Sequence, residues 1–296
     1  MKTRETPRDQ VRYLSVEDGF NIKRPPIVPR VFLEEHRRAF APETPTGLVP
    51  LDQGGLLELD FPATLPLILA RYLRIRAGER VKTRLEASGE IYVVLMGTGA
   101  TEWNEGVIAW SAGDVFVLPG GDERCHRAEG EDAVLYVATN EPLLAFERLR
   151  PPRGQRRPIL PTQYTSASLE QEVRRLSLRT IGDAIAGRAV NLSSAAMEAR
   201  RTCLPSLTVT LNLVLPGEAQ RPHLHNAGAL VLILKGSGCF SVIDGERFTW
   251  QDHTVLLTPP LAVHSHRNNG VEPALAVIVQ DGGLYYHCRT MGFAFA

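Results

Sequence analysis

Three histidines in the last third of the chain have the types and spacing of metal ligands. His223 and His225 are separated by one residue, and His264 follows further along. Alternate side chains of an extended strand share a face, so His223 and His225 point the same way, and a hairpin can carry His264 back beside them. Neutral imidazole binds Fe, Zn, Cu or Ni, and three protein ligands leave positions open for water, substrate or O2. The pattern therefore predicts a metal centre that is open to reactants. The alternative is that His223 and His225 are two exposed polar residues on a strand.

Other polar residues are spaced to surround this centre. His266 follows His264 by two residues, so it shares the inward face and is predicted to act as an acid or base; a surface histidine is the alternative. Asn212 and Thr208 share strand parity and are predicted to line a substrate pocket, with plain wall positions as the alternative. Asn268 is predicted to set a turn, because Asn bonds its own backbone readily.

The glycines and prolines around the histidines form a recognisable frame. The segment from Gly217 to Gly236 and the segment from Pro259 to Asn268 resemble the two motifs of the cupin superfamily. Four residues match the first motif, namely Gly217, His223, His225 and Gly236, while Ala229 stands where that motif has Glu. In the second motif His264 and Asn268 match, and Leu261 replaces the central Gly. The resemblance implies a three-histidine cupin site without the carboxylate.

The chain resembles the gentisate and salicylate 1,2-dioxygenase group in three features. It lacks that Glu, and it has the sequence TPP at 258–260 followed by HSH at 264–266. Members of that group are bicupins that hold Fe(II) on three histidines and cleave an aromatic ring with O2. The resemblance implies that His223, His225 and His264 are ligands and that His266 acts beside the metal. This chain has Val231 where the group has an Arg that holds the substrate carboxylate, and Asn212 where the group has a Gln. The metal of that group typically lies in the N-terminal barrel, whereas here it is expected in the C-terminal one.

The first half of the chain repeats the frame without its ligands. Gly78, Glu90 and Gly97 keep the first motif, but Arg84 and Glu86 occupy the two histidine positions. Gly113, Pro119 and Gly121 keep the second motif, but Arg124 occupies its ligand position, and only His126 remains, in the place of His266. Because Arg keeps its proton, it does not bind a cation. The first half is therefore predicted to be a degenerate barrel without metal.

This internal repeat predicts an all-β fold of two tandem cupin (double-stranded β-helix, or jelly-roll) barrels with an N-terminal arm and a short helical linker. The expected division is an arm over 1–55, a degenerate barrel over 56–150, a linker with a helix over 151–200 and a metal-binding barrel over 201–296. Strands are expected at 69–75, 91–97, 207–215, 229–236, 238–245 and 274–280. The linker helix is expected over 168–187, with Ser168 and Gln171 at capping-box spacing and Leu169, Val173 and Leu176 on one face.

Composition excludes several classes of protein. Lys plus Arg and Asp plus Glu number 33 each, so the chain has no basic field for nucleic acid or an anionic membrane. Local Arg clusters such as Arg200 and Arg201 are expected to be solvated faces. The apolar runs are too short to span a membrane, and the first residues have no signal-peptide core. Four cysteines without paired spacing are expected to be reduced thiols, which predicts a cytoplasmic protein, and a homodimer or homotetramer is expected.

The remaining histidines and tyrosines have plainer predictions. His36 and His253 are expected to face solvent. Tyr285, Tyr286 and His287 are expected either to plug the barrel mouth or to supply a catalytic Tyr.

The favoured function is a metal-dependent dioxygenase that uses Fe(II) and O2 on a small chelating aromatic or enolic acid, with Val231, Asn212 and Thr208 near the substrate. Zn, Mn or Ni remain open as the metal. A metal-dependent binding or sensing bicupin without turnover is the alternative, as is another cupin enzyme such as an isomerase or decarboxylase, because one fold hosts many functions.

Overall fold

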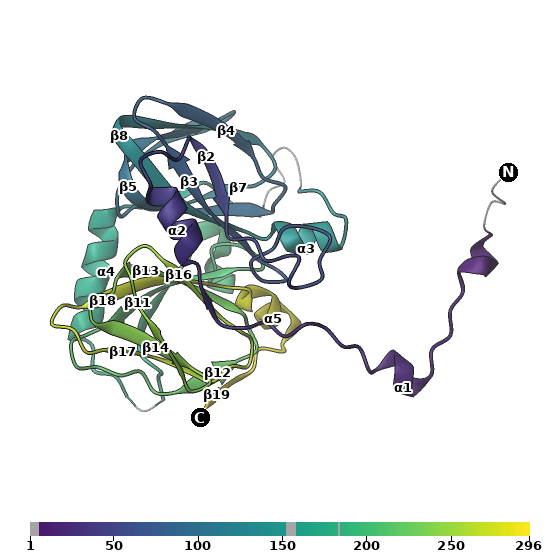
Figure 1. The fold of residues 1–296 in the computed structure, drawn as a ribbon. Helices are drawn as coiled ribbons and strands as arrows, with labels where there is room; N and C mark the ends of the chain where they lie inside the picture. The colour runs from purple at the N-terminus through teal and green to yellow at the C-terminus, as the bar shows by residue number, and fades with distance from the viewer. Residues whose placement is uncertain (1–5, 152–157, 183) are drawn as a thin grey trace.

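A computed structural model describes residues 6–151, 158–182 and 184–296. The expected linker over 151–200 includes residues 152–157 and 183, which lie outside the described residues. Two β barrels stack on each other, and the N-terminal segment extends away from both (Figure 1). The sequence-based expectation of an all-β fold is confirmed.

One antiparallel sheet of eight strands forms the first barrel. Its strands are β2 (Gly47–Pro50), β3 (Leu69–Ile75), β4 (Arg80–Arg84), β5 (Gly89–Trp103), β6 (Gly106–Ser111), β7 (Val115–Pro119), β8 (Glu123–Thr139) and β9 (Thr162–Tyr164). Strand β8 pairs with β4 through its first part and with β3 through its last part, so it bends across both layers. Helix α3 (Glu141–Phe146) follows it.

Two antiparallel sheets form the second barrel. The six-stranded sheet has the order β1 (Arg30–Val31), β16 (Val255–Thr258), β13 (Ala229–Lys235), β18 (Ala274–Gln280), β11 (Thr208–Val214) and β10 (Arg188–Leu192). The five-stranded sheet has the order β15 (Glu246–Thr249), β14 (Cys239–Ile243), β17 (His264–Asn268), β12 (His223–His225) and β19 (Phe293–Phe295). The strands expected from the sequence coincide closely with β3, β11, β13, β14 and β18, whereas β5 continues beyond the expected 91–97 to Trp103.

Three hydrophobic cores explain why several strands are apolar along their whole length. One core fills each barrel, and the third lies between the barrels. Along β13, Val231 and Ile233 point into the second barrel, while Leu230 and Leu232 join the core that both barrels share. A strand buried on both faces loses the alternation of apolar and polar residues. The two barrels therefore pack as one unit.

The linker helix, α4 (Ser166–Leu178), begins and ends earlier than expected. Its N-cap is Thr165, whose hydroxyl accepts a hydrogen bond from the Ser168 backbone N–H at 3.3 Å, so the prediction that Ser168 caps the helix is wrong. Leu169 and Leu176 are buried and Val173 packs against the shared core, as the expected apolar face requires. Short 3-10 helices occur at η1 (Pro7–Gln10) and η2 (Ala195–Arg200).

The N-terminal region contributes to both barrels after a free-standing start. It contains α1 (Val16–Gly19), then β1, helix α2 (Leu33–Phe40) and β2. His36 and His253 were expected to face solvent, and this is wrong, because both are half-buried around α2. The His253 ring stacks on Phe40 with centroids 5.4 Å apart, and Tyr72 of β3 donates a hydrogen bond to the His253 carbonyl at 2.7 Å. These contacts fasten the two barrels to each other.

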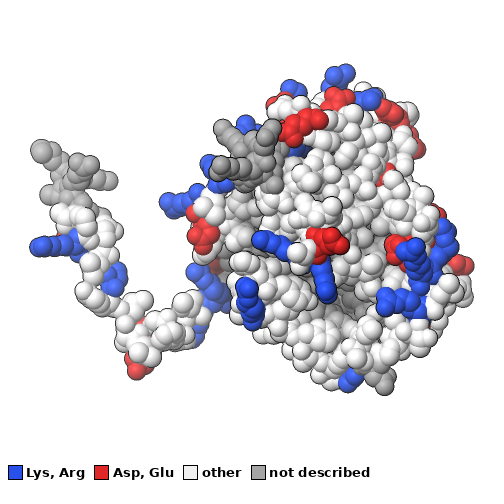
Figure 2. Space-filling view, turned by 180° about the vertical axis from the view of Figure 1, so that it is seen from behind, with Lys and Arg blue, Asp and Glu red and all other residues white. Residues whose placement is uncertain are grey.

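Charged side chains of both signs are interspersed over the face seen from behind (Figure 2). None of the helices formed by the described residues has the length and apolar character needed to span a bilayer.

Candidate metal centre

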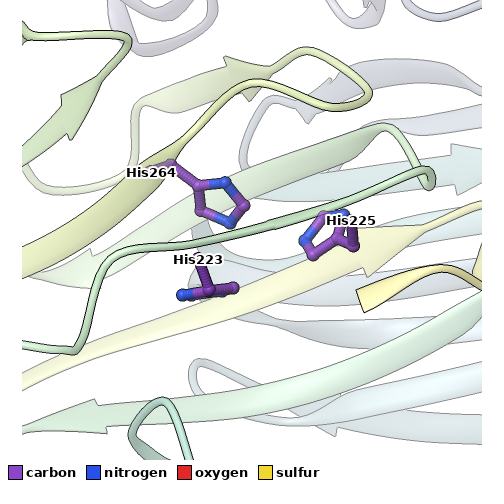
Figure 3. A group of neighbouring side chains, drawn as sticks. All are labelled: His223, His225 and His264. Carbon is purple, nitrogen blue, oxygen red and sulfur yellow. The ribbon is translucent and has the colours of Figure 1, made fainter. Parts of the chain in front are cut away.

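Two neighbouring strands of the second barrel bring the three histidines together. His223 on β12 is the register partner of His264 on β17, and His225 follows on the same face of β12. The strands pair as expected, but the chain between them runs through β13 to β16 and is not a simple hairpin. The three rings point toward one another (Figure 3), and their ligand nitrogens lie within 4.8 Å of each other. All three residues are buried, at 8%, 6% and 4% exposure.

Backbone carbonyls fix the tautomer of each ring. Nδ1 of His223 lies 2.9 Å from the Arg221 carbonyl, Nδ1 of His225 lies 2.8 Å from the Ala227 carbonyl, and Nδ1 of His264 lies 2.9 Å from the Ala262 carbonyl. A carbonyl oxygen only accepts hydrogen bonds, so each Nδ1 carries the ring proton. Each Nε2 is left with a lone pair, which is the arrangement a metal-binding histidine needs.

Burial keeps the rings neutral. Desolvation lowers the pKa of His223, His225 and His264, that of His264 to about 2. Bonds of about 2.1 Å to one ion hold ligand nitrogens roughly 3.0–3.4 Å apart, so nitrogens separated by up to 4.8 Å would move together by up to about 1.4–1.8 Å around an ion. Three neutral nitrogen donors suit Fe, Zn, Mn or Ni and do not choose among them.

His266 lies beside the triad and outside it. Its ring centroid is 6.2 Å from that of His264, and its Nδ1 lies 2.8 Å from the Ser241 hydroxyl. Trp250 Nε1 donates to the same hydroxyl at 2.8 Å, so we assign the Ser241 proton to the bond with Nδ1 and the ring proton to Nε2. Burial lowers the pKa of His266 to about 3. At neutral pH the residue is therefore a neutral hydrogen-bond donor.

A cavity of about 350 Å³ opens onto the triad. Asn212 and Val231 line it as expected, whereas Thr208 lies at the end of the same strand and lines a neighbouring cavity. None of the described residues that line the triad's cavity is Lys, Arg, Asp or Glu. Its polar wall comes from amides and hydroxyls: Thr210, Asn212, Gln220, Thr258, Gln280 and Tyr286.

Four residues that line this cavity were not predicted from the sequence. Gln280 Nε2 lies 3.1 Å from His225 Nε2, and Gln220 Nε2 donates to Asn212 Oδ1 at 3.0 Å. The Thr258 hydroxyl is buried and has no hydrogen-bond partner among the described residues. Phe293 of β19 stacks on His223 with centroids 5.3 Å apart. Gln280 and Phe293 lie outside both motifs, and Gln220 stands at an unspecified position between Gly217 and His223, so only the fold identifies these three residues.

The structure also places the C-terminal residues Tyr286 and His287 and the predicted turn residue Asn268. Tyr286, on α5 (Gly282–Cys288), lines the cavity wall, while His287 is exposed. Asn268 does set a turn, as predicted, because its side-chain oxygen accepts from the Gly270 N–H at 2.8 Å.

The equivalent positions of the first barrel hold charged residues. Arg84 is exposed, and Arg124 is fully buried with its Nε 3.6 Å from a Glu90 carboxylate oxygen. His126 is held between two hydroxyls, Thr83 and Thr101, each 2.9 Å from a ring nitrogen, and Trp110 donates to Thr101 at 3.0 Å. The arrangement of Trp, hydroxyl and His therefore recurs in both barrels.

Comparison with known proteins agrees with this geometry. Residues 211–280 match the cupin domain family. Over 70 residues the chain is 40% identical to gentisate 1,2 dioxygenase 1 of Aquipseudomonas alcaligenes, which is 24% of this chain and 20% of that enzyme. The matched segment thus spans about a fifth of this curated relative.

Solved structures resemble the chain over its whole length. A gentisate adduct of salicylate 1,2-dioxygenase from Pseudoaminobacter salicylatoxidans superposes with a TM-score of 0.77 and 14% identity, covering 100% of this chain and 96% of that one. Oxalate decarboxylase of Bacillus subtilis superposes with a TM-score of 0.55 and 14% identity, covering 86% of this chain and 77% of that one. The chain therefore has the cupin fold, and its second barrel carries a cupin domain sequence.

Proposed function

We propose that the chain is a metal-dependent dioxygenase that holds Fe(II) on His223, His225 and His264 and acts on a small chelating aromatic or enolic acid. The observation that carries the proposal is the convergence of three buried imidazoles, whose ligand nitrogens lie within 4.8 Å of one another and whose Nδ1 atoms each contact a backbone carbonyl. Bound iron would supply redox chemistry with O2. The similarity to gentisate 1,2 dioxygenase 1 supports this choice over other metal chemistry.

The cavity wall favours a substrate that binds through the metal. Because none of the described lining residues is Lys or Arg, a substrate carboxylate has no cationic side chain to meet there. Three neutral imidazoles leave a divalent ion with its full charge, so a chelating anion gains most of its attraction from the ion itself. Amides and hydroxyls such as Asn212 and Thr258 would orient the rest of the molecule.

In this proposal His266 donates a hydrogen bond from Nε2 toward the bound substrate. Anaerobic loading with Fe(II), followed by an oxygen-electrode screen of hydroxybenzoates, catechol-like acids and diketones, tests it. We expect oxygen uptake with at least one class, and a loss of about 100-fold or more in His266→Ala with metal content unchanged. Silence across the panel, with iron confirmed in place, would falsify the dioxygenase proposal for those classes.

One observation favours a binding or sensing protein without turnover. The Trp, hydroxyl and His arrangement around His266 also surrounds His126 in the barrel whose ligand positions hold Arg84 and Arg124. Because the first barrel has the same arrangement, the arrangement can have a structural role in both barrels. If the chain only binds its ligand, His266→Ala alters ligand affinity alone.

We also propose a cytoplasmic homodimer or homotetramer. The segment before β1 extends from the barrels and exposes apolar side chains, among them Tyr13 at 94% and Phe20 at 86% (Figure 1). Apolar side chains gathered on an extended arm mark a site of contact with another chain. The four cysteines are free thiols, which suits a reducing compartment.

A further inference from the structure

The sheet register brings an amide to the place where the cupin motif has its carboxylate ligand. Ala229 occupies the Glu position of the first motif and offers no donor atom. Its register partner on the next strand, β18, is Gln280. Directly paired residues of neighbouring antiparallel strands point to the same face, and both residues line the cavity that opens onto the triad.

The Gln280 side chain reaches the triad itself. Its amide nitrogen lies 3.1 Å from Nε2 of His225, at hydrogen-bond distance from the lone pair that a metal ion would take. Two ligands joined to one ion by bonds of about 2.1 Å are roughly 3.0–3.4 Å apart, for angles of about 90–109°. The end of the Gln280 carboxamide therefore lies at the separation from His225 that a fourth ligand would have. A half-turn of the carboxamide exchanges its nitrogen for its oxygen.

We propose that Gln280 Oε1 completes the metal site as a fourth, neutral protein ligand in place of the missing carboxylate, an inference that rests on the proposed metal centre. The ion would then keep its double charge, because an amide oxygen carries none. An incoming chelating substrate would then either displace Gln280 from the metal or bind next to it.

Titration of the metal-free full chain with Co(II), followed by visible absorption, tests this ligand directly. We expect Gln280→Leu to weaken Co(II) binding about 10-fold or more and to alter the ligand-field bands. Gln280→Glu should tighten binding, and Gln251→Leu, in an exposed turn of the same barrel, should match the wild type. Circular dichroism checks that each variant is folded.

The two proposals fail in different ways. A Gln280→Leu protein with wild-type affinity and bands would overturn the Gln280 ligand while leaving the triad intact. If His223→Ala also bound Co(II) normally, the triad itself would be wrong.

A second cavity, of about 530 Å³, shares the Tyr286 wall with the first and has a different character. Arg200, Arg201 and Arg289 line it together with His287, and no described lining residue is Asp or Glu. Arg200 and Arg201 are exposed, as the sequence predicts. Both residues also line this cavity. Arg201 and Arg289 are C-caps with left-handed backbone, at the ends of η2 and α5.

Two residues that line this cavity have buried hydroxyls without a partner. Thr202 and Thr208 line it at 2% and 5% exposure, and neither hydroxyl has a hydrogen-bond partner among the described residues. An unpaired buried hydroxyl is destabilising, so an acceptor bound in contact with these hydroxyls would be stabilised. The geometry points to a site for a carboxylate or phosphate group, with the arginines supplying charge-assisted bonds.

Calorimetric titration of the metal-free chain at low salt, once with inorganic phosphate and once with succinate, tests this site and identifies the preferred anion. We expect saturable binding of one anion per chain, weakened about 10-fold by Arg289→Gln and by Thr208→Val. Arg80→Gln removes the same charge from an exposed strand of the first barrel and should have no effect. Equal weakening by Arg80→Gln, or no effect of Thr208→Val, would mean diffuse surface attraction and overturn the site.

Discussion

At the scale of single residues, hydrogen bonds to Nδ1 determine what each histidine can do. The rings of the triad donate from Nδ1 to carbonyls and keep a lone pair on Nε2, which in His225 lies 3.1 Å from the Gln280 amide nitrogen. His266 has the Ser241 hydroxyl at Nδ1, and because that hydroxyl accepts from Trp250 we assign its proton to the bond with Nδ1 and the ring proton to Nε2. In this assignment His264 and His266, two residues apart on one strand, offer a lone pair and a hydrogen-bond donor, respectively.

Removal of the Ser241 hydroxyl should destabilise the second barrel. Ser241→Ala leaves Trp250 Nε1 and His266 Nδ1 without their buried partner. We expect the free energy of unfolding to fall by about 1–3 kcal/mol in urea titrations, with metal content unchanged. Ser237→Ala, on an exposed turn, serves as the control and should change stability by less than about 0.5 kcal/mol. Equal stability of the two variants would contradict the bond assignment.

The buried His126 should make stability depend on pH. Burial, with a smaller effect of Arg124, lowers the pKa of His126 to about 3, whereas an unfolded histidine has a pKa of about 6.5. Between these values the unfolded chain binds one more proton, so stability falls as the pH falls from about 6.5 toward about 3.

The matched variant is His126→Gln, which removes the titrating group. Below pH 6.5 the wild type should lose up to about 1.4 kcal/mol per pH unit more than the variant, as measured by urea unfolding of metal-free protein. Parallel pH profiles would contradict a neutral, buried His126.

At the scale of elements, the turn after β17 depends on one side chain. Asn268 Nδ2 donates to the Val214 and Glu272 carbonyls at 2.9 and 2.8 Å, and Oδ1 accepts from the Gly270 N–H. Asn268→Ala should lower the free energy of unfolding by about 2–4 kcal/mol, because buried backbone groups lose their partners. Asn269→Ala, at an exposed position, is the control. A loss below about 0.5 kcal/mol in the Asn268 variant would show that the turn holds without this side chain.

Helices and strands could be predicted where a local sequence pattern, such as an apolar run or the spacing of the histidines, indicates them. The strands at 69–75 and 274–280 match β3 and β18, and the histidine frame predicts the cluster on β12 and β17. Tertiary contacts decided the rest. Thr165 caps α4 in place of Ser168, and β19 pairs with β12 at the far end of the chain. The contact of Gln280 with His225 depends on the register of strands distant in sequence, which no local pattern encodes.

At the scale of the whole molecule, the shared core makes the two barrels a single unit. The outer faces of β11, β13 and β18 bury their leucines and valines against the first barrel. Polar contacts at α2, such as the hydrogen bond from Tyr72 to the His253 carbonyl, fasten the same interface. The first barrel thus has a clear structural role even though Arg84 and Arg124 stand at its ligand positions.

The exposed N-terminal segment predicts self-association. Light scattering at micromolar concentration should give at least twice the chain mass of 32.7 kDa. Removal of residues 1–29 should shift the mass toward the monomer, because the apolar side chains of the segment would lose their covering partner. A monodisperse monomer for the intact chain would contradict the proposed homodimer or homotetramer.

Metal stoichiometry tests the central claim most directly, because every functional proposal depends on one ion held by the triad. Elemental analysis of protein made in iron-replete medium should give one metal per chain. His223→Ala should lose that metal, while Arg84→Ala, at the equivalent position of the first barrel, should retain it. A stoichiometry near two per chain, or unchanged metal in His223→Ala, would contradict a single centre on His223, His225 and His264.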